Sequence, residues 1–357
     1  MGAARSWDIF CRVVDNYGDA AVCWRLARQL ALEHGARVRL WIDRPATLRA
    51  LQPEPVGPGV DIRCWEPDAD FGAPADIALD AFDAGLPERY AARMPSSSLW
   101  IKLEYLSAES WVDDHHGLPS PHPRLAVPRY FFFPGFTPRT GGLLREAGLL
   151  ARRDAFEPGA FWATLGEAPP ESGSLVVSLF GYENPAVGDL LRAWADGPRP
   201  IVVAVAEGRL KPEVAAFFGG ARRRGNLEAR FLPFLPQARY DELLWACDWN
   251  FVRGEDSFVR AQWAARPFVW QIYPQADDAH LAKLDAFLAL YCAGLDAPLA
   301  PLWQAWNRRT PGVVTAWRAL EDRQPALGAH ARAWAAGLAM QPELAGNLAR
   351  FSENLLK

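Results

Sequence analysis

Two carboxylates stand close together in the segment DNYGD, at Asp15 and Asp19. The segment lies between an apolar run (residues 7–14) that predicts a strand and a pattern (20–35) that predicts a helix. Open α/β sheets bind ligands at the carboxyl ends of their strands, which makes both side chains candidates for acid–base chemistry. Structural roles stay open as well, because Asp19 can cap the helix and Asp15 can form an Asx turn.

A second polar cluster, RGEDS, follows the predicted strand WNFVRG (249–254). Asp256 and Ser257 begin the next predicted helix, whose free N–H groups and positive dipole end suit a diphosphate. Because carboxylates repel phosphate, we expect the side chains of Glu255 and Asp256 to face sugar hydroxyls or cap the helix, while the main chain holds phosphate. The alternative is that Asp256 and Ser257 only cap the helix.

Aromatic rings and an amide occupy two further loops. Phe234 and Gln237 follow a predicted strand in EARFLPFLP (228–236). A ring and an amide at this spacing can stack on a pyrimidine and hydrogen-bond it, although a proline-rich turn with a buried Phe is at least as common. Phe180 and Tyr182, in SLFGYEN, allow the same two interpretations.

Metal binding is not predicted. The run DDHH (113–116) places four potential ligands side by side, but adjacent residues rarely face one ion and no partner stands at ligand spacing. The five cysteines, at 11, 23, 64, 247 and 292, include no CxxC pair, so neither a zinc site nor a disulfide framework is indicated. Their odd number favours a reducing cytoplasm.

The elements that must position these residues alternate between strand and helix. In the first half, apolar runs at 7–14, 38–43, 75–82 and 98–106 predict strands, and Gly35 ends the helix after the first of them. Strand–helix–strand units of this length predict right-handed parallel crossovers. Residues 105–140 are rich in Pro, Gly and aromatic residues and show little periodicity, which favours a functional loop over one that only covers a domain face.

A second alternation follows a predicted connector at residues 151–173. Strands are predicted at 173–182, 200–208, 228–236, 249–254 and 267–274, with helices at 188–197, 241–248 and 256–265 and a helical segment at 281–357. Two successive parallel α/β halves predict a bilobal chain that binds ligands between the carboxyl ends of its strands.

Size and charge agree with such a chain. Its 357 residues are about twice what one hydrophobic core serves. A net charge of −4 gives no electrostatic reason to expect nucleic acid or an anionic membrane as a partner. No apolar run reaches a membrane span and the N-terminus is not a signal peptide, so we expect a cytoplasmic protein. A dehydrogenase is disfavoured because no GxGxxG follows the first strand.

With these segments assembled, the sequence resembles the EarP family of protein-arginine rhamnosyltransferases, which modify translation elongation factor P. The matching stretches run from residue 6 to about residue 288. They are SWDIFCRVVDNYGDAAVCWRLARQL, SLWIKLEYLSAESWVDDHHGLPSPHP, YFFFPGFTPRTGGLLRE, SLFGYEN, LPFLPQARYDELLWACDWNFVRGEDSFVRAQWA and PFVWQIYPQADDAHLAKLDAFL. Long ordered matches in both halves make the resemblance specific to this family.

The resemblance implies a GT-B fold, with two Rossmann-like domains facing each other across a cleft. We place an acceptor-binding domain at 1–155, a donor-binding domain at 156–335, and a helical segment at 336–357 that packs back on the first domain. It also implies dTDP-β-L-rhamnose as donor, inversion to an α-rhamnosylated arginine, and no cofactor or metal.

The resemblance further assigns roles to individual residues. Asp15 and Asp19 match two essential aspartates of the first domain, and Glu255 matches an essential glutamate. The donor-site residues it implies are Phe180, Tyr182, Phe234, Gln237, Asp256, Ser257 and Tyr273.

A guanidinium acceptor constrains the chemistry. With a pKa near 13.8, its deprotonation at pH 7 costs roughly 9 kcal/mol, so proton removal must accompany attack on the anomeric carbon. We expect Asp19 to be the base, Asp15 to orient the guanidinium, and a helix terminus to stabilise the leaving diphosphate. Two alternatives stay open: a nucleotide-sugar transferase with a small-molecule or glycan acceptor, and a non-catalytic nucleotide-binding protein.

Overall fold

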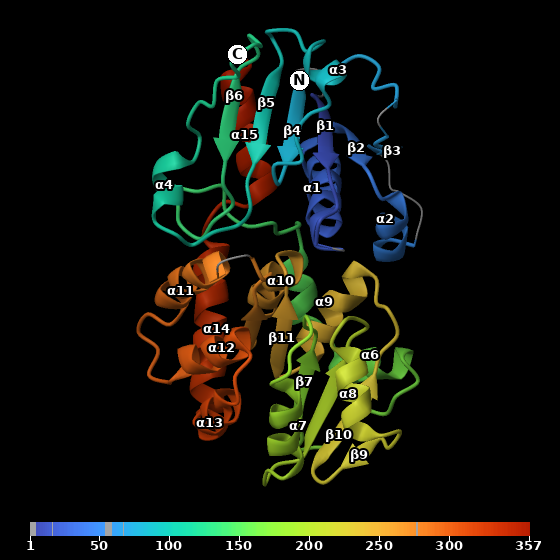
Figure 1. The fold of residues 1–357 in the computed structure, drawn as a ribbon, viewed down its shortest axis with the longest axis vertical. Helices are drawn as coiled ribbons and strands as arrows, with labels where there is room; N and C mark the ends of the chain where they lie inside the picture. Colours follow the sequence, from blue (N-terminus) through green and yellow to red (C-terminus); the bar gives the residue numbers. More distant parts are fainter. Residues whose placement is uncertain (1–4, 16, 54–58, 67, 276–277) are drawn as a thin grey trace. The chain divides into compact units, whose positions relative to one another are not determined.

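The computed structural model describes residues 5–15, 17–53, 59–66, 68–275 and 278–357. The chain forms two compact units, each built around its own six-stranded sheet (Figure 1). The first unit comprises Met1–Ala147 and Ala339–Lys357, and the second comprises Gly148–Leu338. The predicted alternation of strands and helices into two α/β halves is confirmed.

The first unit contains a parallel sheet in the order β3-β2-β1-β4-β5-β6. Its elements are β1 (Ser6–Cys11), α1 (Gly18–His34), β2 (Arg37–Ile42), α2 (Pro45–Leu51), β3 (Val60–Cys64), β4 (Ile77–Ala81), α3 (Glu88–Ala91), β5 (Leu99–Leu103), α4 (Trp111–His115), β6 (Arg129–Phe132) and α15 (Leu344–Leu355). The chain leaves β1 toward β2 and β3 on one side and returns to β4 on the other. The carboxyl end between β1 and β4 is therefore the topological switch point, where such sheets bind ligands.

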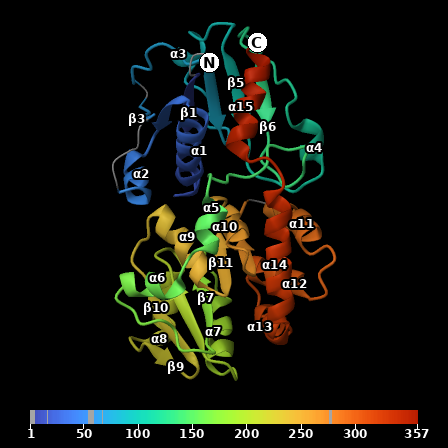
Figure 2. The same ribbon diagram turned by 180° about the vertical axis from the view of Figure 1, so that it is seen from behind.

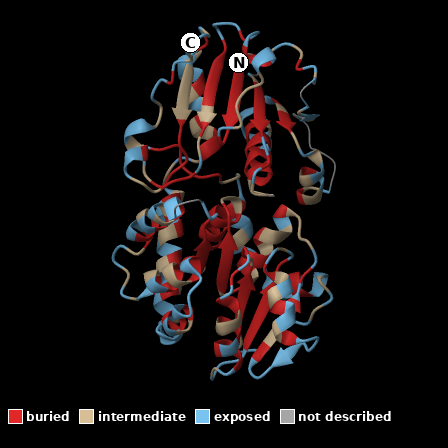
Figure 3. Cartoon of the chain, in the orientation of Figure 1, coloured by how far each residue is buried: buried red, intermediate tan, exposed pale blue. Residues whose placement is uncertain are grey.

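The second unit repeats this plan in the order β12-β11-β7-β8-β10-β9, with β9 antiparallel to β10. Its elements are α5 (Leu149–Asp154), α6 (Pro158–Thr164), β7 (Leu175–Leu179), α7 (Val187–Ala195), β8 (Ile201–Val205), α8 (Lys211–Phe218), β9 (Arg223–Arg224), β10 (Leu227–Phe231), α9 (Gln237–Ala246), β11 (Trp249–Arg253), α10 (Asp256–Ala264), β12 (Phe268–Gln271), α11 (Ala279–Tyr291), α12 (Leu299–Arg308), α13 (Gly312–Arg318) and α14 (Gln324–Ala339). The switch point lies between β7 and β11. In both units the central strands are buried along their length (Figure 3).

Three expectations about local structure need correction. The strand predicted over 7–14 ends at Cys11, because the N–H groups of Val13 and Val14 bind the carboxylates of Asp43 and Asp19 instead of a neighbouring strand. The segment 105–140 is less irregular than expected, since it holds α4 and β6. The connector predicted at 151–173 overlaps α5 and contains α6.

The break between the units lies before α5, whereas the sequence placed it after residue 155. Arg153 of α5 donates to the carbonyl oxygen of Trp263 at 2.8 Å, which ties this helix to the second unit. At its other end the second unit stops at Leu338, and the chain returns to the first unit. There α15 packs against α1 (Figure 2), and Gln29 of α1 donates to the Glu343 carboxylate at the start of α15.

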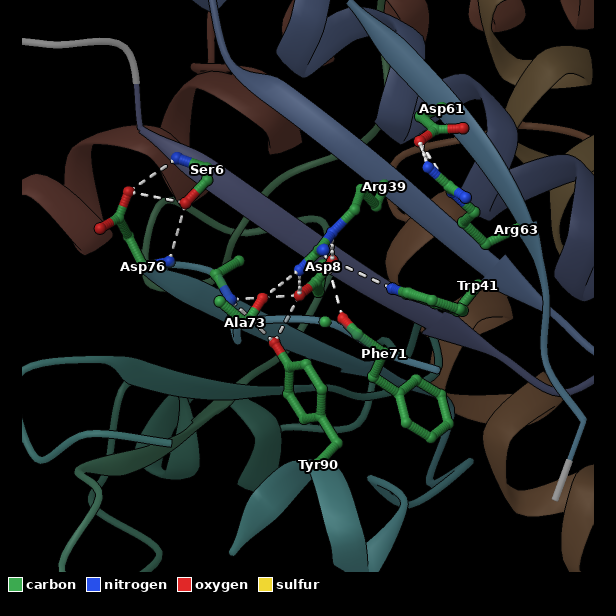
Figure 4. Close-up of polar contacts among 12 residues, drawn as sticks. Ser6, Asp8, Arg39, Trp41, Asp61, Arg63, Phe71, Ala73, Asp76 and Tyr90 are labelled. Atoms are coloured by element: carbon green, nitrogen blue, oxygen red, sulfur yellow. Dashed lines mark hydrogen bonds and ion pairs between the residues drawn. The ribbon is translucent and has the colours of Figure 1, made fainter. Parts of the chain in front are cut away.

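A buried carboxylate fixes the amino end of the central strand β1 (Figure 4). Asp8 is fully buried and pairs with Arg39 through two hydrogen bonds of 2.6 Å. Its oxygens also accept from Trp41 Nε1 at 3.0 Å, from the Tyr90 hydroxyl at 2.6 Å and from the Ala75 N–H at 3.2 Å. Burial and the charge of Asp8 raise the pKa of Tyr90, which keeps its hydroxyl a donor. One carboxylate thus joins β1, β2, α3 and the segment before β4.

We expect Asp8→Ala to destabilise the first unit by about 3–5 kcal/mol, because it removes the counter-ion of Arg39 and leaves two buried donors, Trp41 Nε1 and the Tyr90 hydroxyl, without their acceptor. The matched control is Asp61→Ala, which breaks the exposed pair with Arg63 and should cost about 1 kcal/mol or less. Urea unfolding of the two variants measures the difference. Equal losses in both would show that the Asp8 network does not hold this sheet together.

Candidate functional sites at the two switch points

In the first unit, Asp19 lies at the carboxyl end of β1 and is 3% exposed. Its Oδ2 atom accepts hydrogen bonds from the N–H groups of Val14 at 2.8 Å and Asp15 at 2.9 Å. Its other oxygen, Oδ1, lies 3.5 Å from the hydroxyl of Tyr105, which follows β5. One oxygen therefore holds the loop in place, and the other faces the side chain of Tyr105, in the loop after β5.

The structure overturns the capping interpretation of Asp19. Helix α1 begins at Gly18, and Tyr17 occupies the N-cap position without a side-chain cap. Asp19 thus lies inside the first turn and binds the loop that precedes the helix. Burial raises the pKa of Asp19 above its usual value, and the charge of Asp15 adds to the rise. The N–H groups of Asp15 and Val14 and the Tyr105 hydroxyl oppose it by stabilising the ionised form.

Asp15 is half-buried and lies against the start of α1. Its carbonyl oxygen accepts the Gly18 N–H at 2.6 Å, and a Cβ atom at position 18 would come within 3.1 Å of its Oδ2 atom. Glycine at this position therefore lets the Asp15 carboxylate approach the helix closely. The two aspartates predicted from the sequence thus lie on either side of the start of α1, Asp15 in the loop and Asp19 in the first helical turn.

The second unit gathers most of the predicted donor-site residues at its own switch point. Phe180 and Tyr182 follow β7, and Tyr273 follows β12 with its ring 5.6 Å from that of Tyr182. Gln237 begins α9, and its Nε2 atom lies 3.4 Å from Oδ2 of Asp256, at the start of α10. Phe234 is half-buried in the loop between β10 and α9. These side chains come from the carboxyl ends of four strands.

Glu255 takes the N-cap position of α10, a capping role that the sequence left open for Glu255, Asp256 and Ser257 alike. Its carboxylate makes no side-chain cap hydrogen bond to the helix. The Ser257 hydroxyl is also directed elsewhere, because it donates to the carbonyl oxygen of Arg253 and accepts from the Arg253 N–H. The start of α10 is therefore not capped by the serine that the sequence suggested.

Arg253, at the carboxyl end of β11, is a candidate that sequence reasoning missed. Its guanidinium carbon lies 4.6 Å from the ring centroids of both Phe180 and Tyr182. The residue is 6% exposed, and its Nη1 atom has no hydrogen-bond acceptor among the described residues. A buried cationic nitrogen without an acceptor is costly, so an anion is the chemistry that fits it. The available signal was an arginine inside the buried run WNFVRG.

No group of three or more His, Cys, Asp or Glu residues suited to a metal ion occurs in the described part of the chain. The four side chains at 113–116 do not face one common point. Asp113 and Asp114 both pair with Arg139, and Asp113 also accepts from Thr137. The His115 ring bonds its own helix at Trp111, and the His116 ring accepts from the N–H of Phe133. Within the same described residues, no helix has the length and apolar character to cross a bilayer.

Two Rossmann-like α/β units in one chain are the architecture of the GT-B fold. MurG from Acinetobacter baumannii shares this fold, with a TM-score of 0.55 at 13% identity over 98% of this chain and 99% of that one.

The chain belongs to the EarP family, described as Elongation-Factor P (EF-P) rhamnosyltransferase EarP, whose pattern matches residues 7–353. It is 48% identical to the protein-arginine rhamnosyltransferase of Pseudomonas putida, across 98% of this chain and 99% of that protein. It is also similar to a solved EarP structure concerned with arginine glycosylation of elongation factor EF-P. That match has a TM-score of 0.71 at 38% identity and covers 98% of this chain and 99% of the other.

We expect Arg253→Met to weaken binding of a nucleoside diphosphate, with dTDP as the probe, roughly ten- to hundredfold, because a charge-assisted hydrogen bond contributes about 1.5–3 kcal/mol. Methionine keeps an apolar stem between the two rings and removes only the cationic head. Calorimetry on the full chain measures the affinity, with Arg192→Met, which breaks an exposed ion pair of the same unit, as control. An unchanged dTDP affinity in the Arg253 variant would remove this residue from the donor site.

Proposed function

We propose that this chain transfers L-rhamnose from dTDP-β-L-rhamnose to an arginine side chain of translation elongation factor P, with inversion at the anomeric carbon and in the cytoplasm. Family membership supports the reaction class, and the geometry of Asp19 is the observation that carries the mechanism. A buried carboxylate with one oxygen bound to the loop and the other near Tyr105 suits a general base of defined orientation.

The acceptor guanidinium must lose a proton when it is glycosylated. A carboxylate is too weak a base to remove this proton in a separate step before the attack. In the proposed mechanism, Oδ1 of Asp19 accepts the proton as the guanidinium nitrogen attacks, while Oδ2 keeps its hydrogen bonds to the loop. Asp15 orients the guanidinium and localises its lone pair, since its negative charge lies in the same loop. Tyr105 holds the Oδ1 atom from the other side.

The donor step leaves a diphosphate that needs charge stabilisation. Arg253 and the N-terminal end of α10 provide it in our proposal, the first as a buried cation and the second as N–H groups with a positive dipole end. Glu255 then faces the rhamnose hydroxyls. The ring of Phe234 and the amide of Gln237 bind the thymine, and Phe180, Tyr182 and Tyr273 enclose the nucleotide-sugar. Ser257 contributes indirectly, by holding the main chain of Arg253.

The direct test is the intact mass of elongation factor P after incubation with this chain and dTDP-β-L-rhamnose. The proposal requires a mass increase of one deoxyhexose that maps to an arginine. Transfer to a small molecule or glycan instead would favour the first alternative. Nucleotide binding without transfer to any acceptor would favour a non-catalytic nucleotide-binding protein.

Asp19→Asn separates the proposed catalytic role from the structural one. The amide oxygen can accept the two loop N–H groups as Oδ2 does, so we expect a nearly unchanged melting temperature. A carboxamide cannot take the proton, and loss of general-base catalysis lowers the rate on the order of 10²–10⁴-fold. Melting temperature, dTDP affinity and rhamnosylation rate are measured on the same preparation. A folded variant with wild-type turnover would leave the base unidentified.

Leaving-group stabilisation by Arg253 and α10 predicts a reaction that does not need a metal. Turnover should therefore be unchanged after treatment with EDTA and unaffected by added Mg²⁺ or Mn²⁺. Rates before chelation, after chelation and after metal addition provide the measurement. If activity disappears with EDTA and returns with Mg²⁺, Glu255 and Asp256 become metal-ligand candidates and this part of the mechanism is wrong.

A further inference from the structure

The turn after β4 holds two consecutive non-glycine residues in the left-handed region of backbone space. Phe82 has φ 59° and Asp83 has φ 56°. Backbone strain of this kind persists only where surrounding contacts enforce it. The turn lies at the carboxyl end of β4, beside the Asp19 loop that leaves β1.

Four interactions hold this turn. The Ala84 N–H donates to the carbonyl oxygen of Ala81 at 3.2 Å and closes the turn, and the Phe82 N–H donates to the carbonyl oxygen of Leu103 at 2.7 Å. The buried Asp80 carboxylate accepts the Gly85 N–H at 2.8 Å. The fourth is an ion pair, in which Nζ of Lys102 lies 3.0 Å from Oδ1 of Asp83, whose side chain is 77% exposed. Of the four, the ion pair is the one made by the side chain of a strained residue.

The turn determines where one aromatic ring lies. Phe82 is buried and stacks on Tyr105, with ring centroids 4.6 Å apart and an angle of 17° between the planes. The Tyr105 hydroxyl in turn lies 3.5 Å from Oδ1 of Asp19. A contiguous series of contacts therefore runs from Lys102 through the turn and the two rings to the oxygen assigned the proton.

The Lys102 side chain is mostly buried and is held by several neighbours. Lys102 lies on β5 with its side chain 18% exposed, and its ammonium is 5.4 Å from the Phe131 ring centroid. A second carboxylate, that of Glu104, lies 3.7 Å from the ammonium. Burial raises the pKa of Glu104 and of Asp80, and the Lys102 charge opposes both shifts.

We propose that Lys102 is a positioning residue for the transfer reaction. Through its ion pair with Asp83 it maintains the left-handed turn, and the turn presses Phe82 against Tyr105 so that the hydroxyl stays at Asp19. This inference rests on the proposed function, because it assumes that Asp19 is the base. Lys102 itself touches neither substrate in this scheme.

A purely electrostatic role for Lys102 is the competing explanation. The charge of Asp83 raises the pKa of both Asp80 and Glu104, so removing the Asp83 carboxylate offsets loss of the ammonium whichever residue replaces it. If Lys102 maintains the turn, glycine at position 83 restores activity and alanine does not, because only glycine adopts a positive φ without strain.

The experiment compares rhamnosylation of elongation factor P by wild type, Lys102→Met, Lys102→Arg and the double variant Lys102→Met/Asp83→Gly. We expect Lys102→Met to lower kcat roughly ten- to hundredfold, as for a misplacement of about 1 Å, with dTDP affinity unchanged. Lys102→Arg keeps the charge and should retain most of kcat. The double variant with glycine should recover at least half of the lost activity on a logarithmic scale, whereas Lys102→Met/Asp83→Ala, which removes the same charge, should not recover.

The control is Arg63→Met, which breaks an exposed ion pair of the same sheet and should leave kcat unchanged. Wild-type kcat in Lys102→Met, no recovery with glycine at position 83, or equal recovery with alanine there, would overturn the positioning role. Melting temperatures of all variants show whether a loss reflects unfolding. Absence of modification by the wild type would count against the proposed function instead, so the two failures are distinguishable.

Discussion

The two hydrogen bonds from the N–H groups of Val14 and Asp15 to one oxygen of Asp19 are the interaction on which the first site depends. β1 ends at Cys11, where its backbone loses the neighbouring strands as partners. Carboxylates then serve as the hydrogen-bond acceptors of the backbone. Asp43 accepts the Val13 N–H, and Asp19 accepts the N–H groups of Val14 and Asp15. The residue that we assign as the base thus also holds the loop, which leaves one of its oxygens for chemistry.

The two units place opposite chemistry at equivalent points of one topology. The first has carboxylates at its switch point, at the carboxyl ends of the paired strands β1 and β4, which suits a cationic acceptor. The second has the buried cation Arg253 and a helix N-terminus at its switch point, at the carboxyl ends of the paired strands β7 and β11, which suits an anionic leaving group. The switch point of a parallel sheet is open at the carboxyl ends of its strands. The two units can therefore differ in the loops that follow their strands while they share the same sheet topology.

Much of this organisation was predictable from local patterns. Apolar runs identified most of the long strands, and Gly35 ended α1 as expected, with a left-handed φ of 65°. The loops at the carboxyl ends of strands indicated Asp15, Asp19 and Glu255. Sequence patterns gave wrong predictions where an element is stabilised by a partner far away in the sequence. The segment 105–140 contains a strand that its composition concealed, because β6 is stabilised by pairing with β5 rather than by its own alternation.

The sequence by itself determined the class of the protein: two parallel α/β halves, polar loops after their strands, and motifs specific to one family. Only the tertiary structure decided how individual polar side chains are used. It pairs Asp8 with Arg39, places Arg253 between two rings, and joins Lys102 to the strained Asp83. Apolar periodicity is a local property that one segment carries alone. A hydrogen bond or ion pair between elements depends on register and crossover, which exist only after the sheets have formed.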